Sequence, residues 1–217
     1  CWHYNRQMKN KTKAQVVYIP HHTAHAASAY YGSGFERANI LTIDGSGETE
    51  SFAFFIGENG KIRRVWDIPI ASFLSKGKWR SIGLIYTSVT SLLNLGVNAE
   101  GKTMGLASYG KPAYDFSDIL NIRTHNDYNI DRRKLLSKYG HLQRKDGQPL
   151  TQEHKNLAAS LQHALEKSVV NLAKEAFQQT GIKNFCLAGG VTLNCNTNSE
   201  LLKQEFCDNL FIQPSAN

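Results

Sequence analysis

The sequence lacks the cysteine patterns that bind zinc or form a disulfide framework. Its 217 residues include four cysteines, with no C-x-x-C pair and no metal-finger spacing. A chain this poor in cysteine suits a reducing compartment, so we expect a cytoplasmic protein. We expect no membrane segment, because serine, threonine and asparagine interrupt the uncharged stretch 81–99, whereas a span needs about 20 predominantly apolar residues.

Three common catalytic motifs are also missing. Without G-x-G-x-x-G, nothing supports a Rossmann dehydrogenase. Without a G-x-S-x-G elbow, nothing supports a serine hydrolase. The protease motif H-E-x-x-H is excluded because position 22 holds histidine where the glutamate would stand.

What the chain does contain is a globular composition with a basic excess. Hydrophobic residues make up 41%, enough to bury a core, and the formal net charge is +7. The basic residues gather at 6–13, 76–80 and 132–145, but none of these clusters alternates with aromatic residues as a stacking platform for single-stranded nucleic acid does. We therefore expect no nucleic-acid partner, whereas a phosphate-bearing small molecule fits the charge.

Hydrophobic periodicity and turn residues predict an α/β fold. Strands are expected at 16–19, 40–44, 51–56, 61–68, 184–187 and 210–212, the second to fourth forming an antiparallel meander. Helices are expected at 21–31, 81–95 and 193–204, and between an N-cap at Thr151 and a stop at Gly181. We expect a glycine-punctuated connector at 98–110 and an irregular or partly helical insertion at 114–149.

Two histidines four residues apart could hold a metal. His21 and His25 lie on one face of the expected helix, where both imidazoles can reach one cation. Asp44, at the end of a strand, could complete the two-histidine, one-carboxylate set of open iron, zinc or manganese sites. The alternative is structural, because a helical pair of histidines is more often part of the packing. His22 could orient one of the ligands.

Three glycine-rich segments could contact an anion. The turn 45–48 can cup a phosphate with its backbone amides, or it can be a plain hairpin turn. Gly189 and Gly190 end a strand before a helix, where free amides favour negative charge. In the segment 100–110, Lys102 can face an anionic ligand or be a solvated surface lysine.

Taken in order, five motifs resemble the carbamoyltransferase family. They are HHTAHAAS at 21–28, LTIDGSGE at 41–48, SIGLIYTSVT at 81–90, EGKTMGLASYG at 100–110 and LAGGVTLNCN at 187–196. This family includes nodulation-factor and antibiotic O-carbamoyltransferases, and it is related to the tRNA threonylcarbamoyl transferases and to the hydrogenase-maturation carbamoyltransferase. One departure is Ser108, where the family commonly has proline.

The resemblance implies the two-lobed actin-like, sugar-kinase-like ATPase fold, built from ribonuclease H-like lobes. Residues 1–34 would end the first lobe, and residues 35–217 would form the second lobe, incomplete at its C-terminus. Because the chain begins at Cys1 with no initiator methionine, we expect an excerpt of a longer protein.

The resemblance also implies a chemistry. His21, His25 and Asp44 match the ligands of a divalent metal, expected to be iron. The segments matching those that hold the nucleotide contain Gly45, Ser46, Gly47, Glu48, Gly189, Gly190 and Asn194. A carbamoyl group would pass from carbamoyl adenylate to the hydroxyl of a small-molecule acceptor. A separate domain of the longer protein would make the adenylate from carbamoyl phosphate and ATP.

Two other functions remain open. A tRNA-modifying relative would bind tRNA through the basic clusters, with a steep salt dependence. A non-catalytic regulatory lobe would bind nucleotide without metal, because the actin-like fold also serves as a switch. Metal held by His21, His25 and Asp44 would favour an enzyme.

Overall fold

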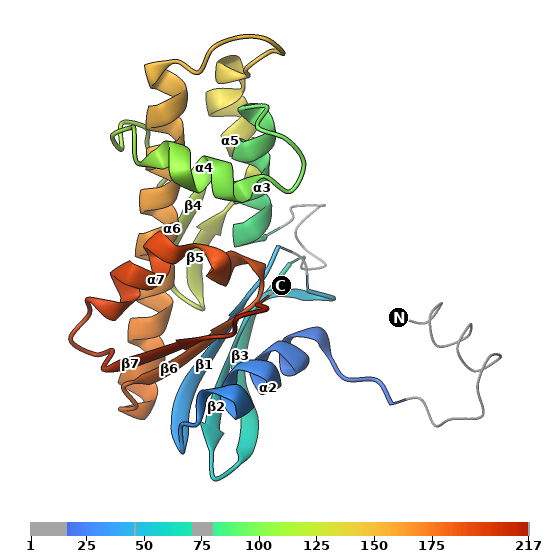
Figure 1. Cartoon of the computed structure of the whole chain (residues 1–217), viewed down its shortest axis with the longest axis vertical. Coiled ribbons are helices and arrows are strands. Elements are labelled where there is room, and N and C mark those ends of the chain that lie inside the picture. Colours follow the sequence, from blue (N-terminus) through green and yellow to red (C-terminus); the bar gives the residue numbers. More distant parts are fainter. Residues whose placement is uncertain (1–16, 46, 71–79, 217) are drawn as a thin grey trace, which may run out of the picture.

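The chain folds around a mixed five-stranded sheet in the order β3-β2-β1-β6-β7 (Figure 1). The computed structural model describes residues 17–45, 47–70 and 80–216. β2 pairs antiparallel with both β1 and β3, whereas β6 pairs parallel with both β1 and β7. The expected α/β class and antiparallel meander are confirmed. The strands are β1 (Arg37–Ile43), β2 (Glu50–Glu58), β3 (Lys61–Pro69), β6 (Asn184–Ala188) and β7 (Asn209–Ile212).

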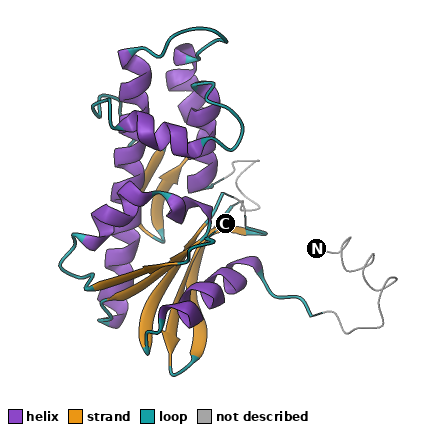
Figure 2. Cartoon of the chain, in the orientation of Figure 1, coloured by secondary structure: helices purple, strands orange, loops and turns teal. Residues whose placement is uncertain are grey.

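A helix covers each face of this sheet (Figure 2). Helix α2 (His21–Ser33) packs on one face, where Ile40 of β1 belongs to its core. Helix α6 (Gln152–Thr180) packs on the other face, in a core that includes Leu41 of β1. Successive side chains of a strand point to opposite faces, which is why neighbours in β1 belong to two different cores.

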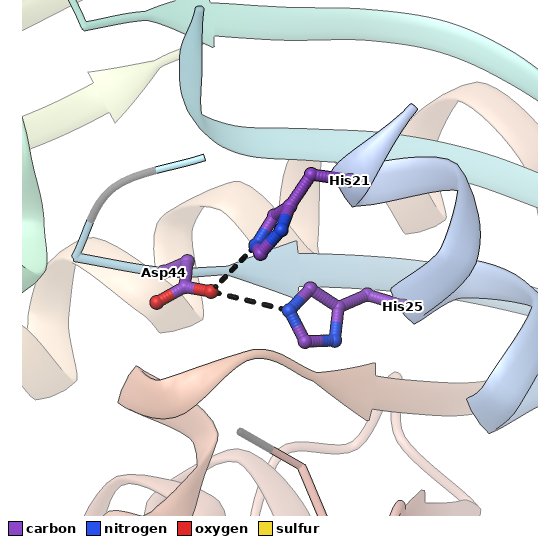
Figure 3. Close-up of side chains that lie close together, drawn as sticks. All are labelled: His21, His25 and Asp44. Carbon is purple, nitrogen blue, oxygen red and sulfur yellow. Dashed lines mark hydrogen bonds and ion pairs between the residues drawn. The ribbon is translucent and has the colours of Figure 1, made fainter. Parts of the chain in front are cut away.

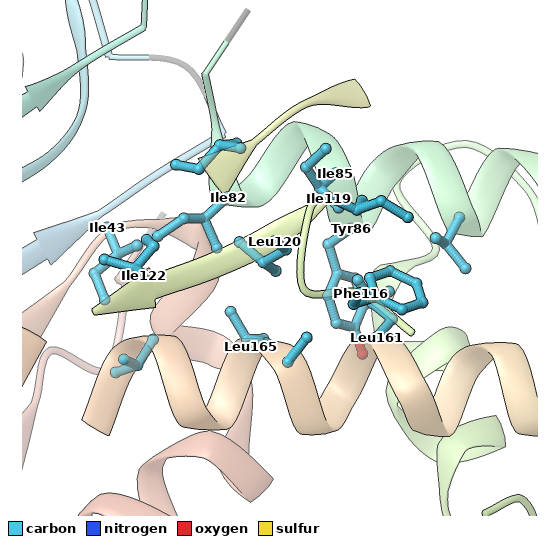
Figure 4. Packing of buried hydrophobic residues seen from close by; sticks show 14 of the residues in the cluster. Ile43, Ile82, Ile85, Tyr86, Phe116, Ile119, Leu120, Ile122, Leu161 and Leu165 are labelled. Carbon is cyan, nitrogen blue, oxygen red and sulfur yellow. The ribbon is translucent and has the colours of Figure 1, made fainter. Parts of the chain in front are cut away.

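The remaining elements extend the α6 side of the sheet. A hairpin of two strands packs on α6, and helix α3 lies over it through apolar side chains such as Ile85 and Ile119 (Figure 4). No helix in the described part of the chain is both long and apolar enough to cross a membrane. These elements are α3 (Ile82–Leu92), α4 (Glu100–Ala107), β4 (Leu120–Thr124), β5 (Asp127–Ile130), α5 (Arg132–Tyr139), η1 (Gly140–Leu142), η2 (Gly190–Leu193) and α7 (Cys195–Leu202).

The strand expected at 16–19 is wrong for the residues that the structure describes. Residues 17–19 have no regular structure, and Val17 is 72% exposed. A β-branched run favours a strand only where a neighbouring strand pairs with it and its side chains pack. Neither of the described sheets includes this segment, and Val16 lies outside the described residues.

The connector expected at 98–110 is also wrong, because most of it forms α4. Thr103 and Leu106 are buried, and α4 packs against α6. A Cβ on Gly101 or Gly105 would meet nothing within 4 Å, so these glycines serve no close approach. Glu100 in the first turn interacts favourably with the helix dipole. Packing thus outweighs the cost of about 1 kcal/mol that each helical glycine adds.

The insertion at 114–149 is partly helical, as expected, but the β4–β5 hairpin is not predicted. Contacts from distant segments hold its turn in place. The ring of His125 stacks on Trp66 with centroids 4.7 Å apart, and His125 Nδ1 lies 2.6 Å from a carboxylate oxygen of Glu175 in α6. No local pattern in the sequence reveals such contacts.

Helix α6 has the two caps that the sequence predicts. The Thr151 side chain accepts a hydrogen bond from the His154 N–H, and His154 Nδ1 accepts one from the Thr151 N–H at 3.0 Å. This reciprocal pair is a capping box. At the other end, Gly181 takes the left-handed conformation with φ 67.

Thr151→Ala is expected to lower the free energy of unfolding by about 1 kcal/mol, because the first turn of α6 loses its side-chain acceptor. Thr151→Ser keeps the hydroxyl and should stay within about 0.5 kcal/mol of the wild type. Urea unfolding followed by circular dichroism measures both differences. Equal stability of all three proteins would contradict the capping role of Thr151.

Candidate metal centre and adjoining pocket

Three potential ligands converge where β1 ends beside the first turns of α2 (Figure 3). His21 Nε2 lies 2.8 Å from Asp44 Oδ2, and His25 Nε2 lies 3.1 Å from the same oxygen. One potential ligand atom from each residue lies within 4.8 Å of the others. The structure therefore brings together the three residues that the sequence singles out, while their role as metal ligands stays a prediction.

The charge and the donor atoms of this cluster suit a cation. Burial disfavours the ionised form of Asp44, but hydrogen bonds from His25, His21 and the Gly45 N–H outweigh it and hold the pKa of Asp44 well below its usual range. The His21 side chain is 37% exposed, against 14% for His25. Two imidazoles and a carboxylate suit a divalent transition metal. The described residues contain no other group of three such ligands.

His22 points into the protein and not toward Asp44, the residue that His21 and His25 both contact. Its Nδ1 lies 2.7 Å from Thr42 Oγ1, and its Nε2 lies 3.0 Å from the Glu50 carbonyl oxygen. Burial lowers the pKa of His22, which favours the neutral ring. A neutral ring can donate from Nε2 to the Glu50 carbonyl and accept the Thr42 hydroxyl at Nδ1.

A pocket of about 630 Å³ begins at Asp44. Its walls come from the turn after β1, from α3, α4 and α6, and from the segment after β6. Three residues predicted to hold a nucleotide line this pocket, namely Gly45, Gly190 and Asn194. The cluster of potential metal ligands and the predicted nucleotide segments therefore meet at one place.

Two glycines allow backbone segments beside the pocket to pack directly against each other. A Cβ on Gly83 would lie 2.5 Å from Gly45 Cα, so α3 can approach the turn only with glycine at this position. A Cβ on Gly189 would lie 2.3 Å from the Ile43 carbonyl oxygen. Gly189 also has φ 97, a value that L side chains rarely adopt.

Four other residues predicted to contact the nucleotide do not line the pocket, namely Gly47, Glu48, Lys102 and Gly189. Gly47 is buried and Glu48 is exposed, while Ser46 lies outside the described residues. Lys102 Nζ donates to the Leu95 carbonyl at 3.1 Å and does not line the pocket. This position favours the surface-lysine alternative for Lys102.

Residues 96–103 also match the P-loop spacing G-x-x-x-x-G-K-T. A P-loop connects a strand to a helix, and its lysine reaches the phosphates. This segment follows helix α3, and its lysine bonds a backbone carbonyl. The segment therefore matches the P-loop in sequence but not in structure.

Asn194 is held by hydrogen bonds within the protein. Its Oδ1 accepts the Thr197 N–H at 3.0 Å and so caps α7. Its Nδ2 donates to Gln162 Oε1 at 2.8 Å, and Gln162 Nε2 donates back to Asn194 Oδ1 at 3.0 Å. The Tyr86 hydroxyl donates to the same Gln162 oxygen at 2.9 Å. Burial raises the pKa of Tyr86, which keeps this donor protonated.

The motifs of the sequence assign no role to Tyr86, Gln162 or Glu100. Gln162 is buried among apolar residues of α6, and only the packing of this helix reveals it. Glu100 and Thr87 both line the pocket, and the Thr87 hydroxyl donates to Glu100 Oε1 at 2.8 Å. A carboxylate at this place can accept hydrogen bonds from hydroxyl groups of a ligand.

Cys195 offers a chemical probe of the pocket wall. Its Sγ lies 3.8 Å from the sulfur of Met104, which lines the pocket. Cys195 is exposed, whereas burial raises the pKa of Cys186 and of Cys207 to about 11.

At pH 8, Ellman's reagent is expected to modify Cys195 more than about tenfold faster than Cys186 and Cys207, because the thiolate is the reactive form and the buried thiols stay protonated. Peptide mapping by mass spectrometry over a time course measures the three rates. Equal rates in the folded protein would show that the two buried thiols are accessible.

Comparison with known families decides where the chain belongs. The family model described as "Carbamoyltransferase N-terminus" matches residues 2–217. The chain belongs to this carbamoyltransferase family.

Two curated relatives of this carbamoyltransferase domain are nodulation proteins. NolNO of Sinorhizobium fredii is 37% identical over 210 residues, which are 94% of this chain and 30% of NolNO. NolO of Bradyrhizobium diazoefficiens is 35% identical over 206 residues, which are 91% of this chain and 35% of NolO. The chain thus spans about a third of the length of these curated relatives.

Solved structures of HypF share the fold of the carbamoyltransferase domain. Full-length HypF, crystallised in a phosphate- and nucleotide-bound form, superimposes with a TM-score of 0.61, covering 95% of this chain and 41% of HypF at 16% identity. At this identity the likeness concerns the fold alone. Because it covers nearly the whole chain, it includes both the five-stranded sheet and the elements around α6.

Proposed function

We propose that this chain is the metal- and nucleotide-holding part of an O-carbamoyltransferase, which moves a carbamoyl group from carbamoyl adenylate to the hydroxyl of a small molecule. The position of Asp44 carries the proposal. Asp44 joins His21 and His25 in one cluster, and it also lines the pocket of about 630 Å³. A metal and a nucleotide bound to these residues would share one site.

The cluster fits a divalent metal, for which iron is the expected identity. Such a metal, when bound, supplies Lewis-acid polarisation of a carbonyl group. The chain contributes Nε2 of His21, Nε2 of His25 and a carboxylate oxygen of Asp44. The Gly45 N–H lies 2.6 Å from the other carboxylate oxygen and holds Asp44 in its orientation.

The pocket suits the adenylate part of the donor. Its volume of about 630 Å³ lies within the range of roughly 300–1,000 Å³ that is typical of small-molecule sites. Met104 and Leu165 provide apolar surface, and Glu100 provides an acceptor for ligand hydroxyls. Gln162 keeps the Asn194 wall in place through the paired amide hydrogen bonds.

The sheet order β3-β2-β1-β6-β7 supports the actin-like lobe that the family resemblance implies. The lobe boundary at residue 34 stays a prediction, and α2, which precedes it, packs on the same sheet as the strands that follow. We expect another part of the full-length protein to form the adenylate from carbamoyl phosphate and ATP. A cytoplasmic location stays an expectation.

The tRNA-modifying alternative gains little from the described basic cluster at 132–145. Lys134 and Lys138 both pair with Asp118, and Arg144 donates to the Leu93 carbonyl at 2.6 Å. Groups already paired within the protein contribute less to a polyanion surface. The regulatory-lobe alternative is nucleotide binding without metal. Measuring the metal content of the chain distinguishes it from the proposed function.

Elemental analysis of the purified chain, before and after anaerobic dialysis against Fe²⁺, tests the proposal. We expect about one equivalent of metal in the wild type, and loss of it in His21→Ala/His25→Ala, since two of three ligands are gone. The matched control is His141→Ala/His163→Ala, which removes two exposed histidines and should keep the metal. A wild-type chain that retains no metal under either condition would contradict the metal-dependent function and favour the regulatory lobe.

A further inference from the structure

One buried ring connects the two segments that carry the potential ligands. His22 lies between His21 and His25 in α2 and is 1% exposed. Its hydrogen bonds reach Thr42 in β1, two residues before Asp44, and Glu50, the first residue of β2. The ring therefore ties the first turn of α2 to both strands that flank the Asp44 turn.

The start of helix α2 has no side-chain cap. Pro20, at the N-cap of α2, makes no side-chain capping hydrogen bond, and the first turn of α2 holds no acidic residue. Residues 17–20, which precede the helix, have no regular structure. The uncapped start of α2 thus depends on contacts with the sheet for its position.

Gly47, in the turn between β1 and β2 that also contains Asp44, packs closely on the His22 ring. A Cβ on Gly47 would lie 2.5 Å from His22 Nε2 and 2.6 Å from the Glu50 carbonyl oxygen. These are the two atoms that form the hydrogen bond of 3.0 Å. Any side chain at position 47 would displace the ring or break this bond, so the need for glycine here follows from packing on His22.

From these contacts we infer that His22 is a positioning residue of the metal centre. It supplies no ligand atom, but it holds α2 against the β1–β2 turn so that His21 and His25 reach the same cation as Asp44. The inference rests on the proposed function, because it requires that the cluster binds metal. Loss of interactions behind metal ligands typically weakens metal binding 10–100-fold, and an effect of this size is expected here.

Titration of the full 217-residue chain with Co²⁺, followed by absorbance, tests the inference. His22→Leu replaces the ring with an apolar side chain of similar size and so removes both hydrogen bonds, whereas Gly47→Ala displaces the ring without altering it. We expect each to lower the Co²⁺ affinity about 10–100-fold. His22→Gln keeps an N–H that can reach the Glu50 carbonyl and should recover part of the affinity.

The matched control is His154→Leu, the same change at a buried histidine in the cap of α6. It should leave the Co²⁺ affinity within about twofold of the wild type, because it alters stability and not the metal centre. Thermal unfolding without metal identifies the folded variants. If His22→Leu does not fold, the test is made with Gly47→Ala, which leaves the histidine in place.

Folded His22→Leu or Gly47→Ala protein that binds Co²⁺ as tightly as the wild type would overturn the inference and leave the proposed metal site intact. An equal loss in His154→Leu would also overturn it, because the effect would then come from general destabilisation. A wild-type chain that binds no Co²⁺ would contradict the metal site of the proposed function and, with it, the role of His22.

Discussion

Gly189→Ala is expected to lower the free energy of unfolding by about 2–6 kcal/mol, the largest stability effect among the substitutions described. Two costs add at this position. The backbone has φ 97 and ψ 154, a conformation that costs a side chain roughly 1–3 kcal/mol. The new Cβ would also lie 2.3 Å from the Ile43 carbonyl oxygen. Forcing extra atoms into a packed site costs about 1–3 kcal/mol.

Substitutions at two other glycines measure the conformational cost and the steric cost separately. Gly181 has φ 67 and nothing within 4 Å of an added Cβ, so Gly181→Ala carries conformational strain alone and should cost about 1 kcal/mol. Gly83 has no positive φ, but its Cβ would lie 2.5 Å from Gly45 Cα, so Gly83→Ala carries the steric cost alone. Urea unfolding measures all three variants. Gly189→Ala as stable as Gly181→Ala would show that the Ile43 backbone yields to the new methyl group.

Elements with strong local signals are predictable from the sequence. Helix α6 has apolar residues at helical spacing between Thr151 and Gly181, and both caps form as expected. The β2–β3 turn contains Asn59 and Gly60, and both take positive φ, as a type I′ hairpin turn requires. In each case the residues that fix the element are neighbours in the chain, so a short window of sequence holds the whole signal.

Elements fixed by distant partners are not predictable in this way. Helix α4 contains two glycines and forms because it packs on α6, a segment about 50 residues further along the chain. The exposed run 17–19 shows the converse, since β-branched residues without a neighbouring strand stay irregular. Local propensity decides neither case, because the deciding partner is absent from the local sequence.

The difference between local signals and distant partners also decides which residues of the site are predictable. The spacing of His21 and His25 on one helix face is a local signal, and the structure brings them together. The third member, Asp44, is recognisable because it follows a strand and precedes a glycine turn. Gln162 lies 32 residues from its partner Asn194, and its role depends on how α6 packs. Side chains that hold a pocket wall from a distant element need the fold before they can be found.

Asp44→Asn is expected to lower the affinity of the chain for a divalent metal more than about 100-fold. Loss of a contact behind a metal ligand already weakens binding 10–100-fold, and this change removes the negative charge of a proposed ligand itself. The fold should tolerate the substitution, because the asparagine oxygen can still accept the Gly45 N–H that Asp44 Oδ1 accepts at 2.6 Å. Circular dichroism verifies folding, and calorimetric titration with Fe²⁺ under anaerobic conditions measures the affinity.

Asp67→Asn is the matched control for Asp44→Asn. Asp67 lies on β3, its side chain is 38% exposed, and it pairs with Arg64 at 3.2 Å. The same chemical change there removes one carboxylate charge, so any effect of net charge alone appears in both variants, and such an effect is small in physiological salt. Wild-type affinity in a folded Asp44→Asn protein would remove Asp44 from the ligand set. It would also remove the link between metal and pocket on which the proposed carbamoyl transfer depends, since Asp44 is the residue that belongs to both.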